Sequence, residues 1–283
     1  MSLKTNRREI LCGAIAAIAA TTKPALAQSA KPDEAGFKLG IASYSLRKLS
    51  RAYAINSLQK LNVRYINIKD VHASLKSTPQ ELAQIRNDFE SAGIAVLGVG
   101  NVDFKKLTAD EMRSRFEYAK AHGAPLIVMA PSHETVGMVE PFVKEYNIKA
   151  AIHNHGPEDK IYPAPADILK DISSMDPRMG ICVDIGHTHR AGADILQSIK
   201  QTGARLHDMH VKDLMDASAK AKQVAVGDGT LPYPAMFSLL DKMGYRGGVM
   251  LEYEINENDP IPGIAQSLGY MRGVIAGLGL KYS

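Results

Sequence analysis

The chain is 283 residues long, with 45% hydrophobic and 23% charged residues. This composition is ordinary for a globular protein, and the length suits one large barrel or two small domains. The formal net charge is +4, but residues 1–27 hold four basic side chains against one acidic one, so the rest of the chain carries only about +1. Nucleic acids and anionic membranes require clustered Lys and Arg, and this balance excludes an electrostatic basis for either partner.

The first 27 residues have the pattern of an export signal. Arg7 and Arg8 precede a short apolar run, residues 12–20, and an A-x-A cleavage site ends at Ala27. These features resemble a twin-arginine signal peptide, which predicts a folded protein delivered to the periplasm or secreted. The apolar run is too short to span a bilayer, so no stable membrane insertion is expected after cleavage. A basic tail or a retained anchor is the alternative.

The remaining chain reads as repeated strand and helix units. Short apolar runs alternate with amphipathic stretches at intervals of about 30 residues, the spacing of successive βα units. Eight such runs occur, the number that closes a parallel barrel, and no Pro- or Ser-rich linker divides them. Residues 28–283 are therefore predicted to form one α/β domain, a single (β/α)8 TIM barrel. The predicted strands are residues 39–43, 65–68, 95–99, 126–129, 150–153, 180–185, 206–211 and 248–253.

Capping motifs indicate helices between these strands. Thr78-Pro79-Gln80-Glu81 offers an N-cap, a proline at the first helical position and a capping-box glutamate. Thr108-Ala109-Asp110-Glu111 repeats the capping box. The polar stretch 213–226 is irregular and is predicted to be an insertion or a lid. Helix ends are indicated by three glycines, Gly93, Gly123 and Gly244.

Histidines and carboxylates gather at the ends of the fifth and sixth predicted strands. In the segment Ile152-His153-Asn154-His155, the alternation of a strand sends both histidines to the barrel interior. Asp184 ends the sixth strand between two outward apolar residues, and His187 follows in the loop.

The seventh and eighth strands continue the same pattern. Asp208, His210 and Lys212 turn inward on the seventh strand, and Glu252 lies on the eighth at a depth comparable to that of His210. Because the carboxyl ends of the strands form the rim where barrel active sites lie, we expect these side chains to converge there.

This convergence predicts a metal site. Two imidazoles and two carboxylates suit one divalent ion of the Mn, Co, Zn or Fe type, since imidazole selects against Mg and Ca. The predicted ligands are His153, Asp184, His210 and Glu252. Such an ion polarises a carbonyl and a neighbouring hydroxyl, which makes proton abstraction next to the carbonyl feasible. The alternatives are a helix cap for Asp184 and an orienting role for His153.

At these residues the sequence resembles the xylose isomerase-like TIM barrel family of sugar phosphate isomerases and epimerases. The resemblance covers essentially all of residues 28–283. It implies metal ligation by Asp184, His210 and Glu252, and a position beside the substrate for His187. Its most specific segments are VDIGH at 183–187, HVKD at 210–213, GDG at 227–229 and LEYE at 251–254.

One position departs from the family pattern. Where ketose epimerases have a glutamate at the end of the fifth strand, this chain has His153. Imidazole can still ligate the metal or move a proton. Loss of a β-substituent needs one base on one face of the substrate, so elimination fits this change at least as well as epimerisation.

Further rim side chains are predicted to contact a polyol or keto sugar. Lys69 is expected to bind an oxyanion or move a proton, with a salt-bridged strand end as its alternative. Tyr44 is expected to form a wall of the site, with plain core packing as its alternative. The predicted substrate contacts are Tyr44, His155, His187 and Lys212. The predicted catalytic residues are Glu252, His153, His187 and Lys69.

The sequence therefore predicts a metal-dependent enzyme acting on a keto sugar, cyclitol or oxidised glycoside by isomerisation, epimerisation or β-elimination. A non-catalytic sugar-binding barrel is the second hypothesis. An apurinic endonuclease-like phosphodiesterase is remote, because it would need further histidines on the second and third strands, where only His72 lies near. The expected partner is a small-molecule sugar. The sequence does not decide between a monomer and a homo-oligomer.

Overall fold

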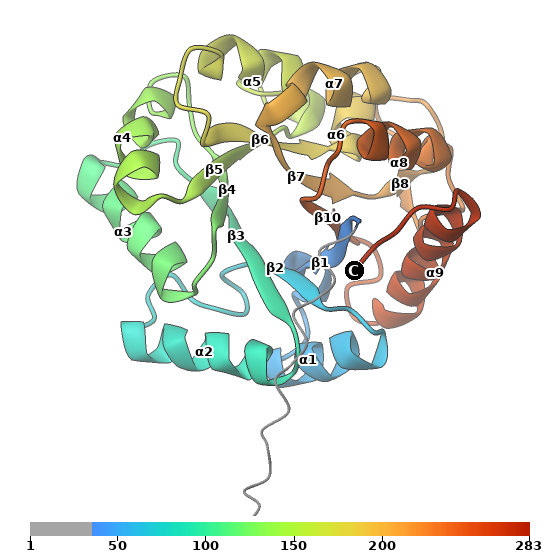
Figure 1. Ribbon diagram of the computed structural model, residues 1–283, viewed down its shortest axis with the longest axis horizontal. Coiled ribbons are helices and arrows are strands. Elements are labelled where there is room, and N and C mark those ends of the chain that lie inside the picture. The colour runs from blue at the N-terminus through green and yellow to red at the C-terminus, as the bar shows by residue number, and fades with distance from the viewer. Residues whose placement is uncertain (1–35) are drawn as a thin grey trace, which may run out of the picture. The chain divides into compact units, whose positions relative to one another are not determined.

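Eight parallel strands close into a barrel in the order β1-β10-β7-β6-β5-β4-β3-β2, surrounded by helices (Figure 1). The predicted single (β/α)8 barrel is thereby confirmed. The computed structural model describes residues 36–283, and the predicted signal peptide, residues 1–27, lies outside the described residues. The barrel strands are β1 (Lys38–Ala42), β2 (Tyr65–Ile68), β3 (Ala95–Asp103), β4 (Leu126–Ala130), β5 (Lys149–His153), β6 (Met179–Asp184), β7 (Leu206–Val211) and β10 (Gly248–Leu251).

Helices alternate with the strands, and the capping signals lie where the sequence predicts them. Thr78 and Thr108 each complete a capping box, with Glu81 and Glu111 respectively. Gly93 follows the second helix with positive φ, as a helix-ending glycine does. Within residues 36–283 no helix is both long and apolar enough to cross a bilayer. The helices are α1 (Arg51–Lys60), α2 (Pro79–Ser91), α3 (Ala109–Ala121), α4 (Val136–Tyr146), α5 (Pro165–Ile172), α6 (Ile185–Arg190), α7 (Ile195–Thr202), α8 (Tyr233–Lys242) and α9 (Ile261–Gly277), with 3-10 turns η1 (Ser43–Leu46), η2 (Gly156–Glu158) and η3 (Gly203–Arg205).

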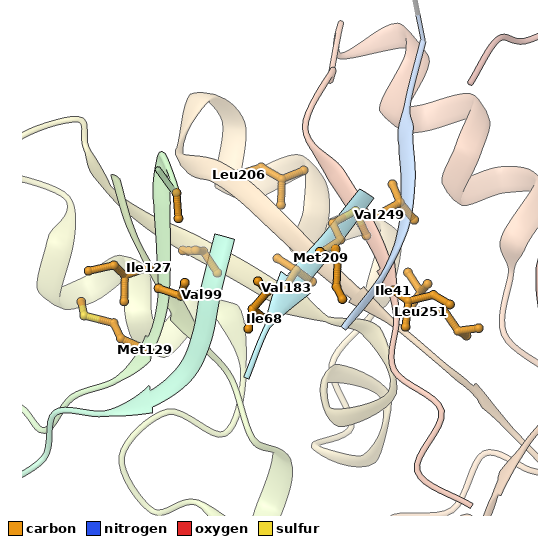
Figure 2. Close-up of a cluster of buried hydrophobic side chains, with 14 of the residues drawn as sticks. Ile41, Ile68, Val99, Ile127, Met129, Val183, Leu206, Met209, Val249 and Leu251 are labelled. Atoms are coloured by element: carbon orange, nitrogen blue, oxygen red, sulfur yellow. The ribbon is translucent and has the colours of Figure 1, made fainter. Parts of the chain in front are cut away.

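The main hydrophobic core lies between the barrel and the helices. Because alternate residues of a strand point to opposite faces, Ile41, Val183 and Met209 pack in this core while their neighbours on each strand turn into the barrel. Figure 2 shows these side chains gathered along the strands. The cluster extends to helix residues such as Phe89 and Phe237. Packing of this kind fixes the strand register and, with it, which residues face inward.

Within residues 36–283, the apolar clusters of the barrel interior are small. Cys182 belongs to one of them and is fully buried, as expected for a core residue. Toward the C-terminal ends of β5, β6 and β7 the inward residues become polar. The two interior clusters consist of Leu126, Val128, Ala151 and Cys182, and of Ala42, Tyr65 and Met250.

The polar stretch after β7 forms a small antiparallel hairpin, in which β8 (Asp213–Leu214) pairs with β9 (Gln223–Val224). The side chain of Gln223 ties this hairpin to the end of β10, donating to the carbonyl of Glu252 at 2.7 Å and accepting from the amide of Glu254 at 3.1 Å. The predicted insertion is thus an ordered part of the C-terminal rim.

A buried histidine makes stability depend on pH. His122 ends α3 with only 1% of its surface exposed, and neither ring nitrogen has a hydrogen-bond partner among the described residues. Burial, helped by the charge of Arg86, lowers its pKa to about 4. An unfolded histidine titrates near 6.5, so below that pH the unfolded state binds a proton that the folded state does not. The free energy of unfolding therefore falls as the pH drops from about 6.5 to 4.

We expect His122→Leu to remove about 2 kcal/mol of the stability loss between pH 7 and pH 5. Urea unfolding of both proteins at the two pH values measures this difference. His72 and His207 also have pKa values lowered by burial, so some pH dependence remains in the variant. If both proteins lost the same stability between pH 7 and pH 5, protonation of His122 would not cost free energy in the folded state.

Candidate metal centre

Four polar side chains meet at the C-terminal ends of adjacent strands. His153 ends β5, Asp184 ends β6, His210 lies on β7 and Glu252 follows β10 directly. The strand register sets their heights, because Asp184 pairs with His210 and His210 with Met250, two residues before Glu252. All four residues are buried. The predicted convergence at the rim is therefore present in the structure.

The four side chains offer one ligand atom each, and these atoms lie within 4.8 Å of one another. His153 Nε2 lies 3.1 Å from His210 Nδ1 and 3.4 Å from Asp184 Oδ2. His210 Nδ1 lies 3.3 Å from Glu252 Oε2. Ligand atoms around a tetrahedral ion with bonds of about 2.0–2.1 Å are about 3.4 Å apart, so these spacings fit a divalent metal.

The charge states of three of these groups also suit a cation. Burial lowers the pKa of His153 to about 3, which keeps the ring neutral. Burial opposes the charged form of Asp184, but Lys212, His187 and His153 outweigh it and hold the pKa of this carboxyl well below its usual range. The pKa of Glu252 is likewise held low, because Lys212 foremost outweighs burial. Neutral imidazole and ionised carboxylate are the forms that bind metal.

The fourth candidate ligand, His210, binds a proton more readily than His153 does. Burial alone would lower the pKa of His210, but Glu252, Asp208 and Asp184 together raise it. The other ring nitrogen, Nε2, lies 4.0 Å from Asp208 Oδ2, so this carboxyl stands behind the imidazole. A metal bound at Nδ1 therefore competes with a proton at this residue.

Asp184 has two roles, one for each oxygen. Oδ1 accepts a hydrogen bond from the amide of His187 at 2.8 Å and caps α6. This helix cap is the role predicted for Asp184 as the alternative to metal ligation. Oδ2 faces the cluster, where it lies 3.1 Å from Lys212 Nζ and 3.4 Å from His153 Nε2. A buried carboxylate oxygen needs a cationic or hydrogen-bonding partner, and a divalent ion held by the four side chains would be a further cationic partner for Oδ2.

Lys212, a predicted substrate contact, lies against the carboxylates of the candidate metal centre. Its side chain is fully buried, and Nζ lies 2.9 Å from Glu252 Oε2 and 3.1 Å from Asp184 Oδ2. It also contacts Glu254 Oε2. Contact between Lys212 and a substrate remains a prediction, whereas its pairing with the ligand carboxylates is structural.

Lys69 lies at a cavity of about 370 Å³ on the same rim. Its Nζ donates to the carbonyl of Asn101 at 2.7 Å, and the Asn101 side chain contacts His155 Nε2 at 3.1 Å. The ring of Tyr44 lies 5.7 Å from Lys69 Nζ. Tyr44 belongs to the turn η1, directly after β1, and its ring faces Lys69.

His187 lines a second cavity of about 510 Å³, and His155 lines both cavities. The predicted loop position of His187 is wrong, because the residue lies in the first turn of α6. The rings of His155 and His187 are 5.6 Å apart, and that of His187 is 5.9 Å from His153. Burial, followed by the charge of His187, lowers the pKa of His155. The two rings thus lie between the four candidate ligands and the open rim.

Residues 55–274 match the protein family described as Xylose isomerase-like TIM barrel. The chain belongs to this family.

Three proteins that are similar to this chain have known names. Inosose dehydratase of Mesomycoplasma hyopneumoniae is 26% identical over 152 residues, which is 47% of this chain and 50% of that protein. The matched stretch spans about half the length of the curated relatives. Two solved structures, each with a TM-score of 0.70, share the fold. The IolI protein with a bound zinc atom is 17% identical and covers 86% of this chain and 99% of its own, and 3-keto-D-glucoside 4-epimerase YcjR of E. coli is 15% identical and covers 84% and 99%.

A larger cavity, about 620 Å³, opens at the opposite face of this xylose isomerase-like barrel. Lys38, Lys149 and Arg178 lie on its wall, at the N-terminal ends of β1, β5 and β6. Within residues 36–283, the side chains that come together as metal ligands all lie at the other face. Chemistry, and not cavity size, therefore selects the C-terminal rim as the site.

Three residues of the site were not singled out from the sequence. Asn154 accepts the amide of Asp184 at 3.0 Å and donates to its carbonyl at 3.2 Å, which holds that ligand in place. Glu254 pairs with Lys212, and the alternation after Glu252 could have indicated it. Asn101 had no signal, because β3 extends to Asp103, beyond its predicted end at residue 99.

Proposed function

We propose that this protein is a metal-dependent lyase or isomerase that removes a proton next to the carbonyl of a keto sugar, cyclitol or oxidised glycoside. The proposal depends on one observation, the cluster of four buried side chains at the rim of the barrel, formed by His153, Asp184, His210 and Glu252. Membership of the xylose isomerase-like family supports it. The names of two relatives, inosose dehydratase and 3-keto-D-glucoside 4-epimerase, support this class of substrate.

The four buried side chains would hold one divalent ion of the Mn, Co, Zn or Fe type. When bound, such an ion supplies Lewis acidity that polarises the substrate carbonyl. His153 acts in this proposal as a ligand and not as a base, because a pKa of about 3 makes it a weak base and its 3% exposure keeps it covered. The zinc atom bound to the related IolI protein is in accord with this set.

Proton transfer is assigned to Lys69 and His187. Lys69 lines one rim cavity, His187 lines the other, and His155 stands between them as a contact for substrate hydroxyls. In a β-elimination, one of these two side chains takes a proton from the carbon beside the carbonyl. The other gives a proton to the departing oxygen. Return of the proton to a carbon or an oxygen of the same intermediate gives isomerisation or epimerisation instead.

Exchange of a carbon-bound hydrogen tests the proposal directly. The protein, loaded in turn with Mn²⁺, Co²⁺ and Zn²⁺, is incubated with a 3-keto glucoside in D2O and followed by NMR. We expect deuterium at the carbon beside the carbonyl, and loss of the β-substituent identifies a lyase. Absence of exchange with every metal, while the sugar still binds, would leave the non-catalytic sugar-binding barrel.

Substitution of His187 separates proton transfer from metal binding. His187→Gln should slow exchange by about 10²- to 10⁴-fold, the usual contribution of a positioned acid or base, while the metal content stays the same. His189→Gln, on the same helix but outside both cavities, is the matched control. If the His187 variant exchanged the hydrogen at the wild-type rate, a residue other than His187 would perform the proton transfer.

A further inference from the structure

The ammonium of Lys212 lies among the carboxylates that form the metal centre. Its side chain is fully buried, and its nitrogen is 2.9 Å from Glu252 Oε2 and 3.1 Å from Asp184 Oδ2. These are the same two oxygens that approach His210 and His153. A third carboxylate, Glu254 Oε2, also contacts the ammonium from the outer side and is 35% exposed.

The stem of Lys212 is held in place by its surroundings. A side chain at Gly186, in the first turn of α6, would lie 2.6 Å from Lys212 Cγ, so the stem passes through space that only glycine leaves open. The hydroxyl of Tyr233 donates to the carbonyl of Lys212 at 3.0 Å. The ammonium can therefore shift between its carboxylate partners only by rotation near its end.

The Lys212 ammonium and a bound divalent ion would thus compete for the same pair of oxygens. A divalent ion held by Asp184 Oδ2 and Glu252 Oε2 is repelled by a fixed ammonium about 3 Å from each oxygen, and this repulsion is strong in a buried site. Glu254 lowers the repulsion, because it offers the ammonium a carboxylate that is not a metal ligand. Lys212 and Glu254 should consequently affect metal binding in opposite directions.

We propose that Lys212 sets the metal affinity of this centre by competing for the carboxylates of Asp184 and Glu252, and that Glu254 favours metal binding by holding the ammonium away from them. This inference rests on the metal centre of the proposed function and adds a residue pair that tunes it. A purely structural ion pair predicts otherwise, since loss of either partner would then weaken the site in the same direction.

Titration of the full chain with Co²⁺ alone tests the proposal. After treatment with a chelator, binding is followed by calorimetry and by the visible absorption of cobalt. Lys212→Met should tighten binding by about tenfold or more, and Glu254→Gln should weaken it by a similar factor. Lys212→Met should also lower the melting temperature measured without added metal, because two buried carboxylates lose their partner.

The surface pair Lys144 and Glu140 supplies matched controls, since Lys144→Met and Glu140→Gln remove a lysine–glutamate pair at 2.7 Å on α4, outside the cluster of candidate ligands. Both should bind Co²⁺ as the wild type does. If Lys212→Met does not fold, Lys212→Gln takes its place, and unchanged or tighter binding in Glu254→Gln overturns the proposal. Weaker binding in both rim variants also overturns it. Wild-type protein that takes up no cobalt contradicts the metal centre itself.

Discussion

Replacement of Asp184 by asparagine should lower the affinity for a divalent metal by more than about hundredfold and abolish turnover, while the barrel remains folded. Loss of a partner behind a metal ligand already costs about 10- to 100-fold in affinity, and Asp184 is a ligand in the proposed set. Asparagine retains an oxygen that can cap α6, since Asn and Asp are equivalent N-caps. Calorimetric titration with Zn²⁺ or Co²⁺, together with the melting temperature, measures both parts of this prediction.

Asp194→Asn is the matched control for this substitution. Asp194 caps α7 by accepting the amide of Gln197 at 2.7 Å, as Asp184 caps α6, but it lies outside the cluster. The control should bind metal normally. Full metal retention in the Asp184 variant would mean that this carboxylate is only a helix cap, and the proposed centre would be wrong.

Replacement of Asp213 by alanine should lower the free energy of unfolding by about 3 to 5 kcal/mol. This buried carboxylate accepts four backbone amides. Leu214 and Leu231 donate to Oδ1 at 2.9 and 3.1 Å, and Gly227 and Gly229 donate to Oδ2 at 3.0 and 3.2 Å. Alanine leaves these donors without their acceptor, and those of the two leucines are buried. Urea unfolding measures the loss.

Asp216→Ala provides the comparison within the same segment. Asp216 is exposed and accepts one amide, that of Ser218, at 2.8 Å. Its removal should change the stability by no more than about 0.5 kcal/mol. Equal effects of the two substitutions would show that the loop from Gly227 to Leu231 is held by something other than Asp213.

The strand pattern, combined with the closure of the barrel, determined which residues meet at the site. The alternation of inward and outward residues in β5, β6 and β7 turns His153, Asp184 and His210 into the barrel. A closed parallel barrel brings the carboxyl ends of all its strands to one rim. Local periodicity together with one topological rule was therefore sufficient to predict the cluster of four side chains before any contact was known.

The capping motifs were equally readable, because each depends on residues three positions apart. Thr78 with Glu81 and Thr108 with Glu111 form their capping boxes as the sequence predicts. The boundaries were less certain where no such local signal exists. β3 continues four residues beyond its predicted end, and Tyr44 and His187 lie in helical turns that follow their strands.

The sequence by itself determined the barrel, the starts of α2 and α3 and the four side chains that converge at the rim, since these follow from periodicity and capping over a few residues. Only the tertiary structure decided how the neighbouring charges are used. Lys212 reaches Glu252 across 40 positions of sequence, and Asp213 reaches Leu231 across 18. The Lys212 pairing depends on the register of β7 against β10 and on the space left by Gly186, and the Asp213 pairing depends on the path of the following loop; no local pattern encodes either.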